Sequence, residues 1–181
     1  MKTIFEEALL KLSVILEELD IGYAIIGAIA SGIYGLPRTT YDIDTLLSLE
    51  KVKIPVFLQR LKERGFIFEE EKILEELKEG YFTAVWYQNM RIDIILSILP
   101  YFKQVIERSA SFNLLDKEMK FAQPEDLIVL KLISNREHDR EDINTIKEIC
   151  SLDIGYIKDS LRRLVGEANP SFLVFQKIFE G

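Results

Sequence analysis

The chain has 181 residues, of which 48% are hydrophobic, and it carries a formal net charge of −7. A chain of this size can bury one good core, so we expect one compact domain with a small helical unit appended. The negative charge argues against a broad, non-specific surface for nucleic acids, and the single cysteine, Cys150, excludes an internal disulfide.

The first part of the chain predicts a helix, a strand, a short helix and a second strand. Apolar residues recur at helical spacing over 3–19 and form a continuous run over 23–26. Gly27 ends that run and opens a short helix, which Gly35 and Pro37 bring to an end. A second β-favouring run follows. We therefore expect the first helix to pack on a sheet whose first two strands are joined by the short helix.

Two aspartates, Asp42 and Asp44, open the second strand. Side chains two residues apart in a strand point to the same face, with Cβ atoms roughly 7 Å apart, while Tyr41, Ile43 and Thr45 are expected to point into the other layer. Two carboxylates this close on an apolar strand repel each other unless a cation lies between them. Oxygen ligands favour magnesium or manganese. The alternative is a pair of surface aspartates beside a glycine-rich connection.

A phosphate site is predicted beside this pair. Gly27 lets the backbone approach a ligand closely, and the first free N–H groups of the helix that it opens point at an anion. Arg38 lies four residues before Asp42. Its guanidinium is expected to offer two N–H donors either to a phosphate or to Asp42 itself.

The middle of the chain predicts helices, a short strand and two hairpins. The stretch 69–79 holds six glutamates against Lys72 and Lys78, which leaves a net charge of −4. The predicted ranges are a helix over 54–64 ended by Gly65, a strand over 66–68, an acidic helix over 72–78, a hairpin of 81–87 with 91–96, a helix ending near Ala110, and a hairpin around Asp116 and Lys117.

A third acidic residue, Asp93, lies between Ile92 and Ile94 in the second strand of the first hairpin. The strand is apolar enough to be central in a sheet, and a carboxylate there needs a partner. An ion pair with Arg91 or another basic residue would meet that need.

The next helix carries one charge in an apolar sequence. Pro124 suits its first position, and the residues over 127–133 are apolar nearly all round, with Lys131 as the exception. A lysine in a buried helix must reach solvent or meet an anion. Asp139 is expected to be the N-cap of the following helix, with Asp142 completing a box-like start.

These residues resemble the nucleotidyltransferase fold shared with DNA polymerase β, and within it the minimal bacterial and archaeal enzymes that include the abortive-infection type toxins. That family carries G-G or G-S at the head of the first helix, then an R-x-T-x-D-h-D run, and a third aspartate on a later strand. This chain has Gly27-Ala28, then Arg38-Thr39-Thr40-Tyr41-Asp42-Ile43-Asp44. The second motif matches fully. Ala28 replaces the usual Gly or Ser and offers no hydroxyl to a triphosphate.

The resemblance, which covers about residues 23–143, implies a two-metal site for nucleotidyl transfer. Three aspartates would bind two Mg²⁺ or Mn²⁺ ions, Lys131 would face the triphosphate, and Asp139 would orient that lysine. The implied site residues are Asp42, Asp44 and Asp93 as catalytic metal ligands; Gly27, Ala28, Arg38 and Lys131 at the phosphates; and Thr40, Arg136, Asp139 and Asp142 in support.

The fold expected from the resemblance is α/β (α+β), a mixed-sheet nucleotidyltransferase fold flanked by helices. Apolar stripes predict three helices over 143–180. We expect a nucleotidyltransferase core over 1–122 and a helical C-terminal segment over 123–181 packed on that core.

The expected activity is transfer of a nucleoside monophosphate from an NTP such as ATP to a hydroxyl, with release of pyrophosphate. The acceptor is left open between tRNA, a protein and a small molecule, and the partner between a second copy of the chain and an antitoxin. One alternative is a catalytically weak or inactive nucleotide-binding or partner-binding subunit of the same fold. Ala28 favours this alternative, whereas the three aspartates oppose it. A weaker alternative is a hydrolase that uses the same metals on water.

The sequence predicts a cytoplasmic protein with no membrane segment. No apolar run approaches the ~18 residues of a membrane span. The N-terminal residues also lack the apolar stretch of a signal peptide.

Overall fold

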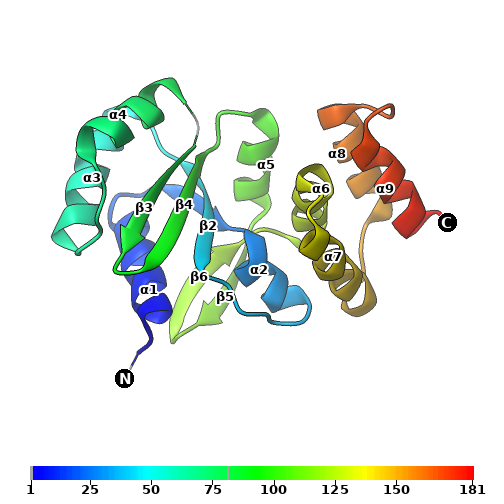
Figure 1. The fold of residues 1–181 in the computed structure, drawn as a ribbon, viewed down its shortest axis with the longest axis horizontal. Helices are drawn as coiled ribbons and strands as arrows, with labels where there is room; N and C mark the ends of the chain where they lie inside the picture. The colour runs from blue at the N-terminus through cyan, green and yellow to red at the C-terminus, as the bar shows by residue number, and fades with distance from the viewer. Residues whose placement is uncertain (1, 81) are drawn as a thin grey trace.

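The computed structural model describes residues 2–80 and 82–181 and contains a six-stranded sheet (Figure 1). The strands are β1 (Gly22–Ile25), β2 (Asp42–Ser48), β3 (Phe82–Tyr87), β4 (Met90–Leu96), β5 (Ala110–Leu114) and β6 (Lys117–Phe121), in the order β3-β4-β2-β1-β6-β5. β1 pairs antiparallel with β2 and parallel with β6, and β2 pairs parallel with β4. The predicted α/β class with a mixed sheet is confirmed.

The helices lie around this sheet and at both ends of the molecule. They are α1 (Ile4–Glu18), α2 (Gly27–Tyr34), α3 (Ile54–Glu63), α4 (Glu70–Glu79), α5 (Pro100–Arg108), α6 (Pro124–Ser134), α7 (Glu137–Ile149), α8 (Ile154–Val165) and α9 (Pro170–Phe179), with a 3₁₀ turn over Lys51–Lys53. Figure 1 shows α6 to α9 grouped at one end, next to α2 and α5, with α3 and α4 at the opposite end. The helices expected over 143–180 are therefore present, although the first of them begins at Glu137.

The two faces of β2 differ in what they meet. Ile43 and Thr45 are fully buried, and Thr45 lies beside Leu12 and Leu16 of α1. Because side chains alternate along a strand, Asp42 and Asp44 point to the opposite face. One face of β2 thus packs in the core, and the other face presents the two aspartates.

Tyr41 departs from the predicted alternation. Its side chain is 82% exposed rather than packed in the other layer. The reason is that β2 begins at Asp42, so Tyr41 precedes the strand and does not follow its alternation. In the first hairpin the strands β3 and β4 form as predicted, whereas Tyr81 lies outside the described residues.

Two other local predictions were wrong in detail. The strand expected over 66–68 is reduced to an isolated bridge between Ile67 and Trp86. The second hairpin turns at Leu115 and Asp116, one residue earlier than predicted, and their φ values are 57° and 61°. Positive φ at both central residues gives a tight turn the twist that matches its strands. Leu115 and Asp116 adopt this conformation although Asn or Gly is usual at such positions.

The C-terminal helices are tied to the sheet domain through Asp126 at the start of α6. This side chain has no exposed surface. It accepts hydrogen bonds from Tyr101 Oη and Arg108 Nε, each at 3.0 Å, and from the hydroxyl of Tyr156. Tyr101 and Arg108 belong to α5 and Tyr156 to α8, so one carboxylate joins three helices. Within residues 2–80 and 82–181, no helix has the length and apolar composition that crossing a membrane requires.

Replacing Asp126 with Asn tests this connection. Asp126→Asn keeps the size but removes the charge that balances Arg108. Because both hydroxyls bind Oδ1 and Arg108 binds Oδ2, the amide places its NH₂ group against either Arg108 or the two hydroxyls. We expect the free energy of unfolding to fall by about 2 kcal/mol or more. Urea unfolding would measure it, with Asp159→Asn, whose side chain is 65% exposed, as the control. A variant as stable as the control would show that the carboxylate does not hold these helices together.

Candidate active site

The register of the central strands brings three carboxylates together. Asp44 of β2 is the direct partner of Asp93 of β4, and Asp42 precedes Asp44 by two residues on the same face. One oxygen from each of the three side chains lies within 4.8 Å of the other two. The sequence predicted these three residues as a set, and the structure brings them to one point.

Gly27 makes room for this cluster. Its φ is +66°, which favours glycine, and a Cβ there would overlap the carboxylate of Asp44, lying 2.8 Å from Asp44 Cγ. The preceding Ile26 N–H donates to the carbonyl of Asp44 at 2.9 Å. The glycine was expected to let the backbone approach a ligand, but in the structure the group lying against it is Asp44.

The protonation behaviour of the cluster reflects crowding of like charges. Burial, and then the charges of Asp42 and Asp93, raise the pKa of Asp44 to about 6. Burial also raises the pKa of Asp93, although Arg91 Nε lies 2.7 Å from Asp93 Oδ1 and opposes that rise. The ion pair expected as the simpler explanation of Asp93 is therefore present alongside the carboxylate cluster. Three converging carboxylate oxygens in partly buried positions suit a hard divalent cation.

Lys131 is buried and neutralised by the two aspartates of α7. Its Nζ donates to Asp139 Oδ1 at 3.2 Å and to Asp142 Oδ2 at 2.6 Å. All three side chains are 7% exposed or less. Burial opposes the ionisation of Asp139, but the hydrogen bond from Ser134 and the charge of Lys131 hold its pKa below the usual value. The lysine thus meets anions, which was one of the two predicted outcomes.

Arg38 lies against Asp142 rather than against Asp42. Its Nε and Nη2 are 3.1 and 3.3 Å from the two carboxylate oxygens of Asp142. Asp42 instead accepts a hydrogen bond from Thr40 Oγ1 at 2.5 Å. The suggestion that Arg38 pairs with Asp42 is corrected, because the loop turns the guanidinium towards α7. Asp142 therefore holds both Arg38 and Lys131.

Asp139 is not the N-cap that local sequence predicted. The N-cap of α7 is Arg136, and Asp139 is the third residue inward. Its carboxylate accepts the backbone N–H of Arg136 at 3.1 Å. The helix begins earlier because Asn135 adopts a left-handed conformation and ends α6 there. The side chain still binds the helix terminus, but from inside the first turn.

A cavity of about 330 Å³ lies between the sheet and the C-terminal helices. Of the predicted site residues it is lined by Gly27, Ala28, Arg38, Thr40, Asp42, Asp44, Lys131, Arg136 and Asp139. Asp93 and Asp142 do not line it but contact residues that do. Thr39, Tyr41 and His138 also line the cavity, although the sequence analysis gave none of them a role in a site. His138 is flanked by charged residues, so nothing local pointed to the cavity.

The fold is shared with solved nucleotidyltransferases. A family model described as a nucleotidyltransferase of unknown function (DUF6036) matches residues 1–172. The chain belongs to this family. A search among curated proteins found no match.

Solved structures share the fold at low sequence identity. The lincosamide antibiotic adenylyltransferase LnuA, solved with lincomycin bound, is 15% identical with a TM-score of 0.57, over 80% of this chain and 96% of that chain. ANT(2'')-Ia in complex with adenylyl-2''-tobramycin is 11% identical with a TM-score of 0.61, over 88% and 98%. A nucleotidyltransferase-like antigenic protein from Paracoccidioides brasiliensis is 15% identical with a TM-score of 0.52, over 97% and 96%. These similarities show a common fold.

Substituting Gly27 tests whether its missing side chain makes room for the cluster. Gly27→Ala would place a Cβ against Asp44, and we expect a loss of about 2 kcal/mol or more in the free energy of unfolding. Gly166→Ala is a matched control, because Gly166 also has a positive φ, of +78°, but has no atom within 4 Å of the added Cβ. Equal melting temperatures for the two variants would contradict the account.

Removing one charge of the cluster should stabilise the metal-free protein. Folding raises the pKa of Asp44 from 3.8 to about 6, so the ionised carboxylate destabilises the folded protein. This destabilisation grows as pH rises through that interval and reaches its full size above it. For Asp44→Asn at pH 7 in excess chelator, we expect the free energy of unfolding to rise by about 1–3 kcal/mol. Thermal unfolding at neutral and acidic pH measures this, and the gain should shrink in acid. A variant less stable than wild type at both pH values would refute the charge repulsion.

Proposed function

We propose that this chain transfers a nucleoside monophosphate from an NTP to a hydroxyl group, using Mg²⁺ or Mn²⁺ held by Asp42, Asp44 and Asp93. The observation that carries the proposal is the convergence of these three carboxylates within 4.8 Å beside a cavity lined by Arg38 and Lys131. Acidic metal ligands next to basic phosphate ligands are what phosphoryl chemistry requires. Membership of a nucleotidyltransferase family supports the same reaction.

The carboxylates supply oxygen ligands on one face, and their mutual repulsion favours a cation between them. Once bound, a divalent ion lowers the pKa of the acceptor hydroxyl and neutralises charge on the phosphates. Asp42 and Asp44 would hold the ion nearest the nucleotide. Asp93 would stand on the side of the acceptor.

The basic residues would bind and orient the triphosphate. Lys131 and Arg38 are held in place by Asp142, so little conformational freedom is lost when they meet a phosphate. Arg136 faces the same cavity. The α2 terminus at Gly27 offers free backbone N–H groups to the same anion. Ala28 is buried and has no side-chain hydroxyl, so backbone N–H groups would donate the hydrogen bonds to the triphosphate there.

The reaction then follows the usual balance of phosphoryl transfer. The acceptor oxygen bonds to the α-phosphorus, the bond from that phosphorus to the oxygen bridging to the β-phosphate breaks, and pyrophosphate leaves with the electron pair. The hydroxyl proton passes to Asp93 and from there to solvent. Burial raises the pKa of Asp93, which makes it a better base than an ordinary aspartate.

The donor that we propose is ATP, and the compartment is the cytoplasm. The acceptor classes are a small molecule, a protein and tRNA. One solved structure with this fold is a lincosamide antibiotic adenylyltransferase, and another contains adenylyl-2''-tobramycin. Of the three acceptor classes, these two structures support a small molecule. A second copy of the chain or an antitoxin is proposed as partner.

The direct test follows label from each of four α-labelled NTPs, with Mg²⁺ or Mn²⁺, into total tRNA, a protein extract and a small-molecule pool. We expect label in one acceptor class together with pyrophosphate release. The Asp42→Ala/Asp44→Ala protein serves as the blank. Metal-dependent NTP binding without turnover would instead favour a nucleotide sensor, and release of free monophosphate would favour a hydrolase.

The role of Asp93 can be tested separately. Asp93→Asn removes the proposed proton acceptor, and we expect transfer to slow by about 10²- to 10⁴-fold while NTP still binds. Single-turnover label transfer measures the rate and equilibrium dialysis the binding. Asp159→Asn is the surface control. A rate within about twofold of the control would exclude Asp93 as the base.

A further inference from the structure

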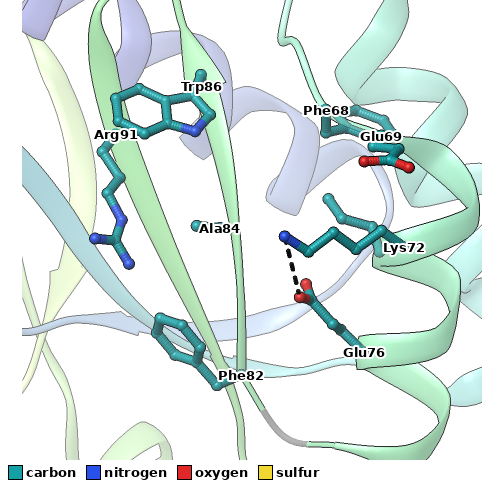
Figure 2. A pocket seen from close by; sticks show the side chains of 9 residues that line it. Phe68, Glu69, Lys72, Glu76, Phe82, Ala84, Trp86 and Arg91 are labelled. Atoms are coloured by element: carbon teal, nitrogen blue, oxygen red, sulfur yellow. Dashed lines mark ion pairs between the residues drawn. The ribbon is translucent and has the colours of Figure 1, made fainter.

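A second cavity, of about 350 Å³, lies along the edge strand β3, next to the strand that carries Asp93. Figure 2 shows it as a groove between the β3–β4 hairpin and α4. Phe82, Ala84 and Trp86 of β3 face it from one side, and Lys72 and Glu76 of α4 from the other. We call this space the hairpin groove. None of the roles proposed for the nucleotide or the metals uses it.

The strand register places the hairpin groove beside the reacting group. Ala84, at its centre, is the direct partner of Asp93, and Asp93 is the direct partner of Asp44. Directly paired residues project from the same face of a sheet, and neighbouring strands lie about 5 Å apart. A ligand seated over Ala84 therefore lies one strand from Asp93 and two from Asp44, on the carboxylate face. Arg91, which contacts Asp93, is a lining residue of the groove.

The hairpin side of the groove suits a ring. Phe82 and Trp86 are large apolar side chains that remain 44% and 45% exposed on an edge strand. They flank Ala84, whose small side chain leaves the space between them open (Figure 2). Exposed aromatic faces stack on flat or alicyclic rings and attract cations. The volume is that of a small-ligand pocket.

The helix side of the groove is acidic. Glu69 and Glu76 line it. Glu76 accepts a hydrogen bond from Thr83 Oγ1 at 2.5 Å and lies 3.9 Å from Lys72 Nζ, whereas among the described residues no ion pair engages Glu69. The stretch 69–79 has six glutamates and two lysines. Within the groove Lys72 offsets Glu76 and Arg91 is paired with Asp93, so the attraction for a small cation comes from Glu69 and from the excess of glutamates along α4. The charge therefore disfavours tRNA and favours a cationic compound.

We propose that the hairpin groove is the acceptor site and that the acceptor is a small, ring-containing cation with a free hydroxyl. This inference rests on the proposed function, because it names the acceptor for the same Asp93. The ring lies against Trp86 and Phe82, the positive charge lies towards Glu69 and Glu76, and the hydroxyl points past Ala84 to Asp93.

Trp86 provides a direct readout, since it is the single tryptophan in the chain. Three sugar probes that share a ring but differ in charge are titrated without NTP or metal: glucosamine, N-acetylglucosamine and glucuronate. We expect a saturable change in Trp86 fluorescence that is strongest for glucosamine and weakest for glucuronate. No saturable change with glucosamine, or tighter binding of glucuronate, would overturn the proposal, as would a larger response to total tRNA.

Variants locate the binding. Glu69→Gln removes a carboxylate that lines the groove, and we expect glucosamine affinity to fall about two- to fivefold. Glu71→Gln is a matched control, because Glu71 lies in the first turn of α4, two residues after the N-cap Glu69, but does not line the groove. Ala84→Met fills the space between the two rings and should abolish the fluorescence response. Equal effects of the two glutamine variants, or an unchanged response in Ala84→Met, would place the probe elsewhere.

The titration separates this inference from the proposed function. It needs no turnover, so a saturable glucosamine response in a protein that transfers no label would count against the transferase and leave the groove as a binding site. Label transfer without any glucosamine response would support the transferase and overturn the groove as a site for cations.

Discussion

The mutual repulsion of Asp42, Asp44 and Asp93 is the constraint on which the rest of the site depends. Strand pairing sets their positions, since Asp44 and Asp93 are register partners and cannot move apart without breaking the sheet. Burial removes the water that would screen them, and it raises the pKa of Asp44 to about 6. The core on the opposite face of β2 holds this arrangement in place. The repulsion thus lowers the stability of the folded protein, and a divalent cation bound between the carboxylates would relieve it.

The cations near this cluster are mostly committed to other carboxylates. Lys131 and Arg38 are bound by Asp142, and Asp139 adds a second contact to Lys131. The sheet side of the site is therefore negative, whereas Lys131 and Arg38 on the other side are balanced by Asp139 and Asp142, and Arg136 adds a further cation to the cavity. Metal ions would bind on the first side, and the phosphates of an NTP would meet the N–H donors on the second. Residues of α6 and α7 line the same cavity as Asp42 and Asp44, and Asp126 ties α6 to α5 and α8.

The sequence predicted the elements governed by local chemistry. Strand alternation placed Asp42 and Asp44 on one face, and the apolar surroundings of Asp93 marked it as a residue in need of a partner. Local rules failed where distant contacts decide the geometry. Arg38 and Asp142 are 104 residues apart in sequence, so no spacing rule could pair them. Asp139 was displaced from its expected N-cap by the left-handed Asn135, and the hairpin groove depends on α4 packing beside β3.

The measurement closest to the central claim is a Mn²⁺ titration of the chelator-treated protein, followed by the loss of the free-ion signal in electron paramagnetic resonance. The account predicts saturable binding that disappears in Asp42→Asn/Asp93→Asn and survives in Asp159→Asn. Mg²⁺ should compete for the same site, because both ions favour oxygen ligands. Binding that is unchanged in the double variant, or absent from the wild-type protein with and without ATP, would contradict the assignment of the three carboxylates as metal ligands.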